Sequence, residues 1–476
     1  MERGKRQANR GDGLTWKALT LFAALATLLA ASALLGACTT QQPTVEPAGE
    51  PTGEPTGEPT GERTSEFAVA QPAMPQKASE DDPEAWLDTL EKNPVDQPFV
   101  ESLSAFAYRS SASVLGGAAD DGGEPVADDP NRMYSPLSLY YALALANEGA
   151  AGQTRDEIDA VLGAPAGVSV PEQCGNLFRV LATDPFSTVD LANSIWMAKD
   201  NPFEQSFVDT ATGQFYATPF SVEFGTEATD RAMAAWISEK TGGTIDPQVK
   251  TERDLLLSII NTVYFKGSWT DPFDAASTAS ATFHAAAGDV ETDFMTQRID
   301  SLQGYRRTDD FLRASLAFTG GTMMTFVLPN EGVSVDDLLS DEQRLAEAFA
   351  VDDNEDEYGF ITYVVPKAAF DTEFDLIPAL ERLGMEAAFD DRADFSNLTS
   401  TPAYISMVKQ ESHIAWDEEG AEASAYTNIG ISEMSAMIPE GDEVELRLDR
   451  PFLFQITSSQ GIPLFVGVCG NPAAEA

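Results

Sequence analysis

Hydrophobic and polar positions divide the chain into three parts with different patterns. A largely apolar stretch, residues 18–35, lies near the N-terminus. A polar segment follows in which Pro, Gly, Glu and Thr repeat. From about Asn93 onward, short apolar runs alternate with polar ones, as they do in a chain that buries a core. The pattern therefore predicts a leader, a linker and a long globular part.

The apolar stretch has the features of an export signal. Basic residues precede it: Arg3, Lys5, Arg6, Arg10 and Lys17. A charged segment before an apolar one is typical of signal peptides, and this apolar stretch is short for a membrane span. It ends in Leu35-Gly36-Ala37-Cys38, which looks like a bacterial lipobox, so residues 1–37 are predicted to be removed and Cys38 to be acylated. An ordinary signal peptide or an anchor helix with a chance cysteine is the alternative.

Residues 38–92 are predicted to form a tether. Within them, residues 46–61 read EPAG-EPTG-EPTG-EPTG, a four-residue repeat. Pro, Gly and Glu at this density do not supply a packed core, so we expect a disordered or extended segment. Acyl chains on Cys38 would hold the protein at a membrane, since each buried methylene contributes about 0.8 kcal/mol. The expected location is the extracellular or periplasmic face of that membrane.

The remaining residues, 93–476, are expected to form one domain, because no second segment has the composition of the tether. Cys469 follows the apolar run 464–468, which suits a buried strand. Cys174 and Cys469 are the cysteines left for this domain. Their spacing does not decide between a disulfide and two buried thiols.

A run of small residues stands near the C-terminus, before the apolar segment that begins at Phe452. Ala and Ser lose little side-chain entropy when ordered, so this run fits either an exposed loop or a tight site. Residues two apart in a strand share a face. One face would carry Ala421, Ala423, Ala425 and Thr427, and the other Glu422, Ser424, Tyr426 and Asn428. The first face is small and the second suits solvent; a surface linker rich in small residues is the alternative.

Charge narrows the range of partners. The chain has 77 acidic and 29 basic residues, which gives a formal net charge of −48. No basic cluster occurs outside the leader, so nucleic acids and heparin-like polyanions are disfavoured as partners. Such acidity keeps a protein soluble and self-repelling, and we expect a monomer. It also suits a salt-adapted source.

The residues offer little for catalysis. There are two histidines, His284 and His413, and neither stands in an HExxH motif. GxSxG and P-loop motifs do not occur. The acidic run 352–357 lacks the spacing of a calcium-binding loop. We therefore expect no enzyme, no metal and no cofactor, and a hydrolase of another fold is the remote alternative.

The order of several motifs resembles the serpins, a family of suicide-substrate protease inhibitors. The motifs are, in chain order, NRMYSPLSL (131–139), GAAGQT (149–154), LANSIW (191–196), WISEKTGGTI (236–245), NTVYFKGSW (261–269), PFLF (451–454) and PLFVG (463–467). Each motif is weak by itself. Their order over nearly the whole globular part makes the resemblance specific.

The resemblance implies an α+β serpin fold with three β-sheets, about nine helices and an exposed reactive-centre loop. It implies a serine protease as partner, which attacks the loop as a substrate and forms a covalent acyl-enzyme. The cut loop then inserts into sheet A as a new strand and distorts the protease before water releases it. A serpin-fold protein that binds without inhibiting is the main alternative, and the small-residue face favours the inhibitor.

The resemblance also assigns the hinge and the reactive bond. The hinge comprises Glu419, Gly420, Ala421, Glu422, Ala423, Ser424 and Ala425. The family's reactive bond lies fourteen residues past the hinge glycine, which places it between Met434 and Ser435. The unbranched apolar Met434 suits a chymotrypsin-, elastase- or subtilisin-like pocket. The loop is a few residues longer than in many relatives, so the bond between Met437 and Ile438 is the alternative.

Two further regions follow from the resemblance. Ser135, Ser138 and Asn261 match the shutter, a polar network under sheet A. Relatives often place a histidine ten residues before the hinge glycine, where this chain has Gln410. Glutamine donates and accepts hydrogen bonds but does not titrate near neutral pH. Trp269 is assigned to the family's breach region.

Overall fold

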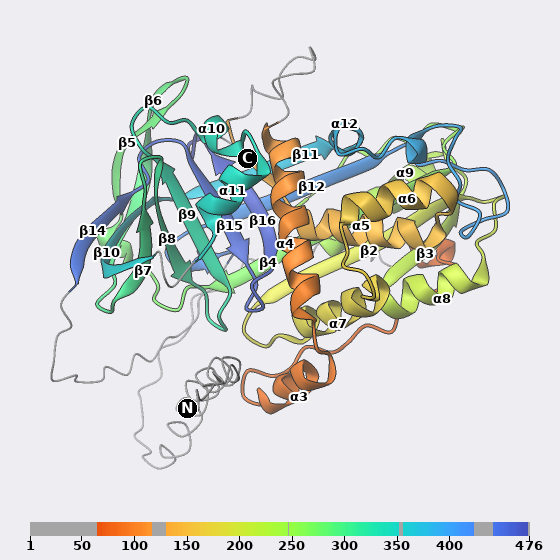
Figure 1. The fold of residues 1–476 in the computed structure, drawn as a ribbon, viewed down its shortest axis with the longest axis horizontal. Helices are drawn as coiled ribbons and strands as arrows, with labels where there is room; N and C mark the ends of the chain where they lie inside the picture. Colours follow the sequence, from red (N-terminus) through yellow and green to blue (C-terminus); the bar gives the residue numbers. More distant parts are fainter. Residues whose placement is uncertain (1–63, 117–129, 246, 352–355, 423–440, 475–476) are drawn as a thin grey trace, which may run out of the picture. The chain divides into compact units, whose positions relative to one another are not determined.

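The computed structural model describes residues 64–474 except for 117–129, 246, 352–355 and 423–440 (Figure 1). All of the described residues lie in one structural unit. They contain ten α-helices and sixteen strands, and the strands form hydrogen-bonded sheets of six and ten strands. The leader 1–37 and Cys38 lie outside the described residues. Within the described part of the chain, no helix has the length and apolar character needed to cross a membrane.

The six-stranded sheet has the order β11-β12-β13-β4-β2-β3. Its strands are β2 (Thr188–Ala198), β3 (Ala217–Val222), β4 (Leu257–Ser268), β11 (Ala368–Asp375), β12 (Val408–Trp416) and β13 (Gly420–Ala421). Along β11 and β12 buried side chains alternate with more exposed ones, as in a sheet with one face in solvent. β2 and β4 are buried on both faces over much of their length, because helix α9 (Glu227–Lys240) packs on the outer face.

The ten-stranded sheet has the order β1-β16-β15-β9-β8-β7-β10-β6-β5, with β14 beside β10. Its strands are β1 (Arg132–Tyr134), β5 (Ala279–Ala285), β6 (Gly288–Arg298), β7 (Gln303–Arg307), β8 (Phe311–Ala317), β9 (Met323–Pro329), β10 (Glu357–Pro366), β14 (Asp442–Arg447), β15 (Phe452–Thr457) and β16 (Pro463–Cys469). β10 begins beside β7 and ends beside β6. The expected three sheets thus form two hydrogen-bonded networks, because this one strand joins two of them.

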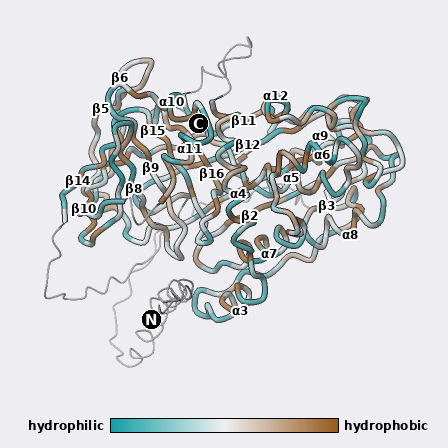
Figure 2. Tube along the Cα trace, viewed as in Figure 1, coloured by the Kyte–Doolittle hydropathy of each residue, from teal (hydrophilic) through white to brown (hydrophobic). Residues whose placement is uncertain are grey.

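Helix α5 (Pro136–Gly149) lies at the centre of the core, and every residue in it except Glu148 is buried. Pro136 suits the first helical position, and the hydroxyl of Ser135 accepts a hydrogen bond from the N–H of Ser138. The helix contacts β4 and β16, which belong to different sheets. Its apolar surface therefore joins the two sheets, and hydrophobic residues gather along it (Figure 2).

Other helices surround this centre. They are α3 (Glu84–Lys92), α4 (Gln97–Ser111), α6 (Gly152–Leu162), α7 (Val170–Thr183), α8 (Gln205–Gln214), α10 (Val335–Leu339), α11 (Glu342–Phe349) and α12 (Ile377–Arg382). Cys174 in α7 and Cys469 in β16 are separate buried thiols, which decides the alternative that their spacing left open. Burial raises the pKa of both thiols, so they are unreactive parts of the core.

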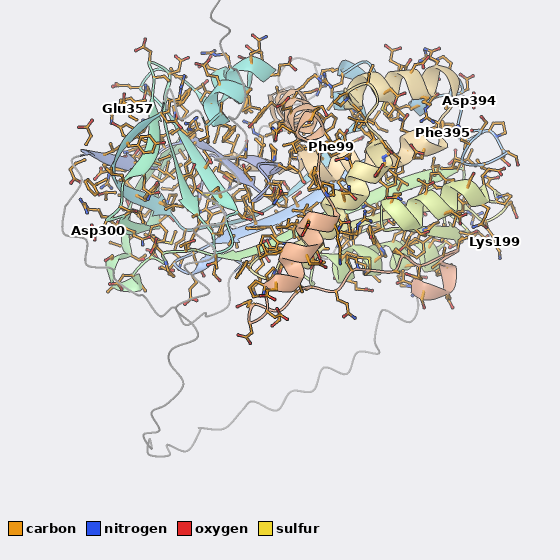
Figure 3. The ribbon with its side chains drawn as sticks, turned by 60° about the horizontal axis from the view of Figure 1, so that its bottom comes forward. Phe99, Lys199, Asp300, Glu357, Asp394 and Phe395 are labelled. Carbon is orange, nitrogen blue, oxygen red and sulfur yellow. The ribbon has the colours of Figure 1, made fainter. Side chains whose placement is uncertain are left out.

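Two segments far apart in sequence meet at the start of α6. The N–H of Ala151 donates to the carbonyl of Asp394 at 2.8 Å, and the N–H of Asp394 donates to the hydroxyl of Thr154 at 2.9 Å. Phe395 follows and is buried. Figure 3 labels Asp394 and Phe395 at this helical end, and Glu357 on β10 at the other. The contact therefore holds the connection between α5 and α6, which the motif at 149–154 forms.

The folded part begins earlier than the predicted boundary at residue 93. Ala68 forms an antiparallel bridge with Phe220 on β3, which is the edge strand of the six-stranded sheet. The N–H of Val69 donates to the carbonyl of Pro219 at 2.8 Å. Residues 64–92 therefore belong to the folded unit, and the predicted tether over 38–92 is too long by this segment.

Helix α3 fixes the rest of this segment to the body. The indole of Trp86 is buried and donates to the carbonyl of Val180 in α7 at 3.3 Å. Its ring meets Phe186 edge-on with centroids 6.1 Å apart. The buried side chain of Trp86 thus attaches α3 to the body of the protein, although the acidic composition around it does not predict a packed helix.

We predict that Trp86→Ala destabilises the whole domain. Truncating a buried aromatic side chain costs about 3–5 kcal/mol in a full core, and the lower end applies at this peripheral helix. The thermal midpoint should therefore fall by several degrees, as measured by calorimetry. Met74→Ala is the control, because the Met74 side chain lies in the same segment and is 55% exposed. Equal midpoints for the wild type and both variants would mean that the segment is not held.

Candidate functional site

The candidate loop leaves the six-stranded sheet after β13 and returns to the ten-stranded sheet at β14 (Figure 1). The structure describes the hinge residues Glu419, Gly420, Ala421 and Glu422. The remaining hinge residues and both candidate bonds lie outside the described residues, and their assignments stay predictions: Ala423, Ser424, Ala425, Met434–Ser435 and Met437–Ile438. The site is therefore built from the start of the loop and the strands that hold it.

Strand β13 lies between β12 and β4. Ala421 pairs with Trp416 on β12 and with Gly267 on β4, and it is fully buried. At Gly420 the φ angle is +156°, and a Cβ atom there would lie 2.1 Å from the carbonyl oxygen of Gly267. Only glycine fits this close approach. The first hinge residues thus already occupy a strand position inside the sheet.

Trp269, assigned to the breach, holds the turn that leads into β13. Its indole donates to the carbonyl of Asp417 and its backbone N–H donates to the carbonyl of Glu419, both at 2.9 Å. Its ring stacks on Phe318 with centroids 4.2 Å apart. Lys367 donates to the carboxylate of Glu418 in the same turn at 2.8 Å. Trp269 therefore positions the hinge by fixing two backbone carbonyls.

Glu422 was expected on the solvent side and is instead largely shielded, with its side chain 10% exposed. It shares a face with Tyr264, whose hydroxyl bonds its carboxylate, and lies 3.6 Å from Nε2 of His413. Burial raises the pKa of Glu422. Its φ angle is +47°, a left-handed conformation that costs a residue other than glycine roughly 1–2 kcal/mol. The pattern of alternation gave the correct face but could not show these neighbours.

Beyond the end of the short strand β13, strands β12 and β4 are not paired with each other over most of their length. Among the described residues they pair directly at Val408–Ile259 and Lys409–Ile260 only. At their other end, β13 lies between them and pairs with Trp416 of β12 and Gly267 of β4. Residues 410–415 of β12 and 261–266 of β4 lie between these two places and are not paired with each other. The sheet therefore has two strand edges side by side that one further strand could pair with.

The shutter residues lie at the point where the strands part. The side-chain oxygen of Gln410 accepts from the N–H of Ser135 at 2.6 Å, and its amide donates to the carbonyl of Ser135 at 3.0 Å. The hydroxyl of Ser135 donates to the carbonyl of Leu464 at 2.7 Å. Gln410 thus ties β12 to the start of α5. Ser138 contributes its N–H, while its buried hydroxyl has no partner in the described part of the chain.

Asn261 belongs to a second polar contact. Its amide donates to the side-chain oxygen of Asn193 on β2, and the amide of Asn193 donates to the carbonyl of Phe215 at 3.0 Å. The predicted shutter therefore consists of two pairs, Gln410 with Ser135 and Asn261 with Asn193. Sequence reasoning missed Asn193. The signal was a polar side chain inside the apolar strand LANSIW, because a buried amide needs a partner.

Metal chemistry finds no support in the described ranges, where no group of three or more His, Cys, Asp or Glu side chains could hold an ion. His284 lies beside Asp289 at the surface. His413 lies between Asp371 and Glu422. The carboxylates beside both histidines belong to strands and the hinge, and the site is organised around strand edges.

We predict a pH-dependent contribution of Glu422 to stability. Because its pKa is raised in the native state, the native protein takes up this proton more readily than the unfolded chain. The contribution of Glu422 therefore becomes more favourable as the pH falls toward the ordinary value of 4.5. The thermal midpoint of the wild type minus that of Glu422→Gln should rise between pH 7 and that value. A difference that stays flat over this pH range would contradict the prediction.

Comparisons with known proteins agree with this geometry. The family model for serpins, described as serine protease inhibitors, matches residues 124–472. Serpin-ZXA of Oryza sativa subsp. japonica is 30% identical over 398 residues, which cover 78% of this chain and 97% of that protein. An uncharacterised serpin-like protein of Methanosarcina acetivorans is 26% identical and covers 73% of this chain and 83% of its own length.

Solved structures show the same fold. The native state of tengpin, a thermophilic serpin, has a TM-score of 0.67 at 23% identity, covering 86% of this chain and 98% of tengpin. Serpin48 of the insect Tenebrio molitor has a TM-score of 0.66 at 26% identity, covering 79% of this chain and 98% of Serpin48. The expected fold is confirmed, and family and fold together support a protease-inhibitor function in general. The chain belongs to the serpin family of serine protease inhibitors.

Proposed function

We propose that this serpin is a surface-tethered suicide-substrate inhibitor of serine proteases with apolar primary specificity. The observation that carries the proposal is Ala421, which is fully buried between β12 and β4. The loop already enters the sheet at this residue. Its direction leads along the two unpaired strand edges, and Ala423 and Ala425 follow on the same face.

The target protease treats the loop as a substrate. Its catalytic serine oxygen attacks the carbonyl carbon of Met434 and passes its proton to the catalytic base. The peptide bond to Ser435 breaks, and the new amine of Ser435 leaves with that proton. The product is an ester between the protease and Met434. Insertion of the freed segment then distorts the protease before water can cleave the ester.

Insertion gains energy from the strands that are parted in the native protein. Each backbone hydrogen bond contributes about 0.5–1.5 kcal/mol net. An extended backbone at Glu422 would also release the strain of its left-handed φ angle. Insertion of a serpin loop into a β-sheet is an established case of strand addition. This chain therefore needs a loop with a small-residue face and a pair of open strand edges that can accept it.

The proposed location rests on the N-terminal residues. Removal of residues 1–37 and acylation of Cys38 would attach the protein to a membrane surface facing the outside or the periplasm. Because the folded unit begins by residue 64, the tether is residues 39–63. A coil of that length spans roughly 30 Å. The protease would therefore be captured close to the membrane.

The charge of the chain limits its other partners. A net charge of −48 repels polyanions and further copies of the same chain. This supports a monomer that acts without nucleic acid and without a heparin-like cofactor. A serpin that binds another molecule without inhibiting is the alternative, and it predicts loop cleavage without a stable complex.

The test is complex formation. We predict that chymotrypsin, elastase or subtilisin gives a complex that survives SDS, whereas trypsin gives little. Ala421→Arg should convert the inhibitor into a substrate that is cut without a complex, because an unpaired charge at this buried position would keep the start of the loop out of the sheet. Ala286→Arg is the matched control, since residue 286 is exposed in the turn between β5 and β6, outside the site, and should leave inhibition intact. If Ala421→Arg inhibits as well as the wild type, at an unchanged ratio of inhibitor to protease, the insertion mechanism is contradicted.

The reactive bond has its own test. Met434→Arg should shift inhibition toward trypsin-like proteases, because an arginine meets the acidic floor of their pocket, and Met437→Arg should do much less. Oxidation of Met434 to the polar sulfoxide should weaken inhibition of the original target, and a methionine sulfoxide reductase should restore it. Mass spectrometry of the released C-terminal fragment decides the register: a new N-terminus at Ser435 supports Met434, and one at Ile438 refutes it.

A further inference from the structure

A cavity of about 480 Å³ lies where β12 and β4 part, on the face of the sheet that α9 covers. Its lining combines apolar side chains with a polar margin: Met233, Ile237, Ile260, Thr262, Lys250 and Glu411. A cavity of about 150 Å³ is enough to bind a benzene ring. This cavity can therefore accept an aromatic side chain without displacing α9.

One buried polar atom on the cavity face of β4 has no hydrogen-bond partner among the described residues. It is Oγ1 of Thr262, a residue that is 2% exposed. Leaving such an atom unpaired costs about 1–3 kcal/mol. At the margin, burial and the nearby carboxylate of Glu373 raise the pKa of Glu411. The lining is thus suited to an occupant that is aromatic and also carries a polar group.

The register of β13 determines which loop residue would reach this place. Ala421 pairs with Gly267 on β4 and with Trp416 on β12. Continuing both antiparallel pairings for five residues places Tyr426 beside Thr262 and beside Glu411. The direct pair Val408–Ile259 has the same offset between the two strands. Both strand edges therefore lead to the same residue.

The face is also fixed. Side chains alternate along a strand, so Tyr426 shares the face of Glu422, on which Tyr264 and His413 lie. Ile260 and Thr262 line the cavity, and Ile260 packs with α9 on the same outer face. Tyr426 would therefore point toward α9. This face of the segment carries Glu422, Ser424, Tyr426 and Asn428, and Tyr426 is the aromatic residue among them.

We infer that this cavity receives the side chain of Tyr426 when the loop inserts, with its ring against Met233 and Ile237 and its hydroxyl at the polar margin. The inference rests on the insertion proposed above and adds the residue that fixes the inserted strand against α9. A buried aromatic ring contributes more than the small residues around it, because it removes a larger apolar area from water. Tyr426 would thus hold the strand halfway along its path.

The experiment compares intact protein with protein nicked between residues 428 and 438 by a protease that is then removed. Unfolding in guanidinium gives the midpoint of each form. For the wild type, nicking should raise the midpoint. For Tyr426→Ala, the intact midpoint should equal that of the wild type, while the nicked midpoint should fall clearly below it. Ser424→Ala is the matched control on the same face, because residue 424 falls beside Tyr264, away from the cavity.

A double-mutant cycle with Ile237→Ala identifies the contact. Residues that touch give non-additive effects, so Tyr426→Ala and Ile237→Ala should be coupled in the nicked form and additive in the intact form. If nicking raises the midpoint of the wild type but Tyr426→Ala matches it, or if the cycle is additive in both forms, the inference is overturned while the inhibitory mechanism stands. If nicking raises no midpoint at all, insertion itself is refuted, and the inference falls with it.

Discussion

A sheet whose two central strands are joined only at their ends is the constraint on which this molecule depends. β12 and β4 pair directly over two residues at one end, and β13 joins them at the other. Paired strands are the normal state of a sheet, so two parted edges must be held by something other than each other. The hydrogen bonds of Trp269 hold the turn at one end, and those of Gln410 to Ser135 tie β12 to α5 at the other.

The parted edges are also protected. An exposed strand edge can pair with another chain, and natural proteins cover such edges. Here α9 and its following residues cover the outer face at the point of parting, and α5 closes the inner face. The edge strand β3 is covered in turn by the bridge between Ala68 and Phe220. The chain's own loop therefore has the most direct access to the opening, because it begins inside the sheet.

The sequence predicted the fold and part of the site through the order of weak motifs. Ser135 and Gln410 meet as expected, since each is polar in an apolar setting and the motif order brought them to one place. Asn193 was missed because only the structure shows that β2 places it opposite Asn261. The burial of Glu422 was missed because Tyr264 lies more than 150 positions earlier in the chain. The packing of Trp86 was missed because the average composition of a segment does not show that one side chain in it is buried.

The two sides of β13 respond to different conditions in solution. On the inner side, Ala421 is fully buried, and a Cβ atom on its neighbour Gly267 would lie 2.8 Å from Phe265 and 3.2 Å from Phe318, so this side is set by volume alone. On the outer side, His413 lies between the carboxylates of Glu422 and Asp371, and burial raises the pKa of Glu422. Ionic strength and pH therefore affect the interactions on the outer side and not the packing on the inner side. A change in ionic strength would therefore alter how firmly the start of the loop is held without altering the space that admits it.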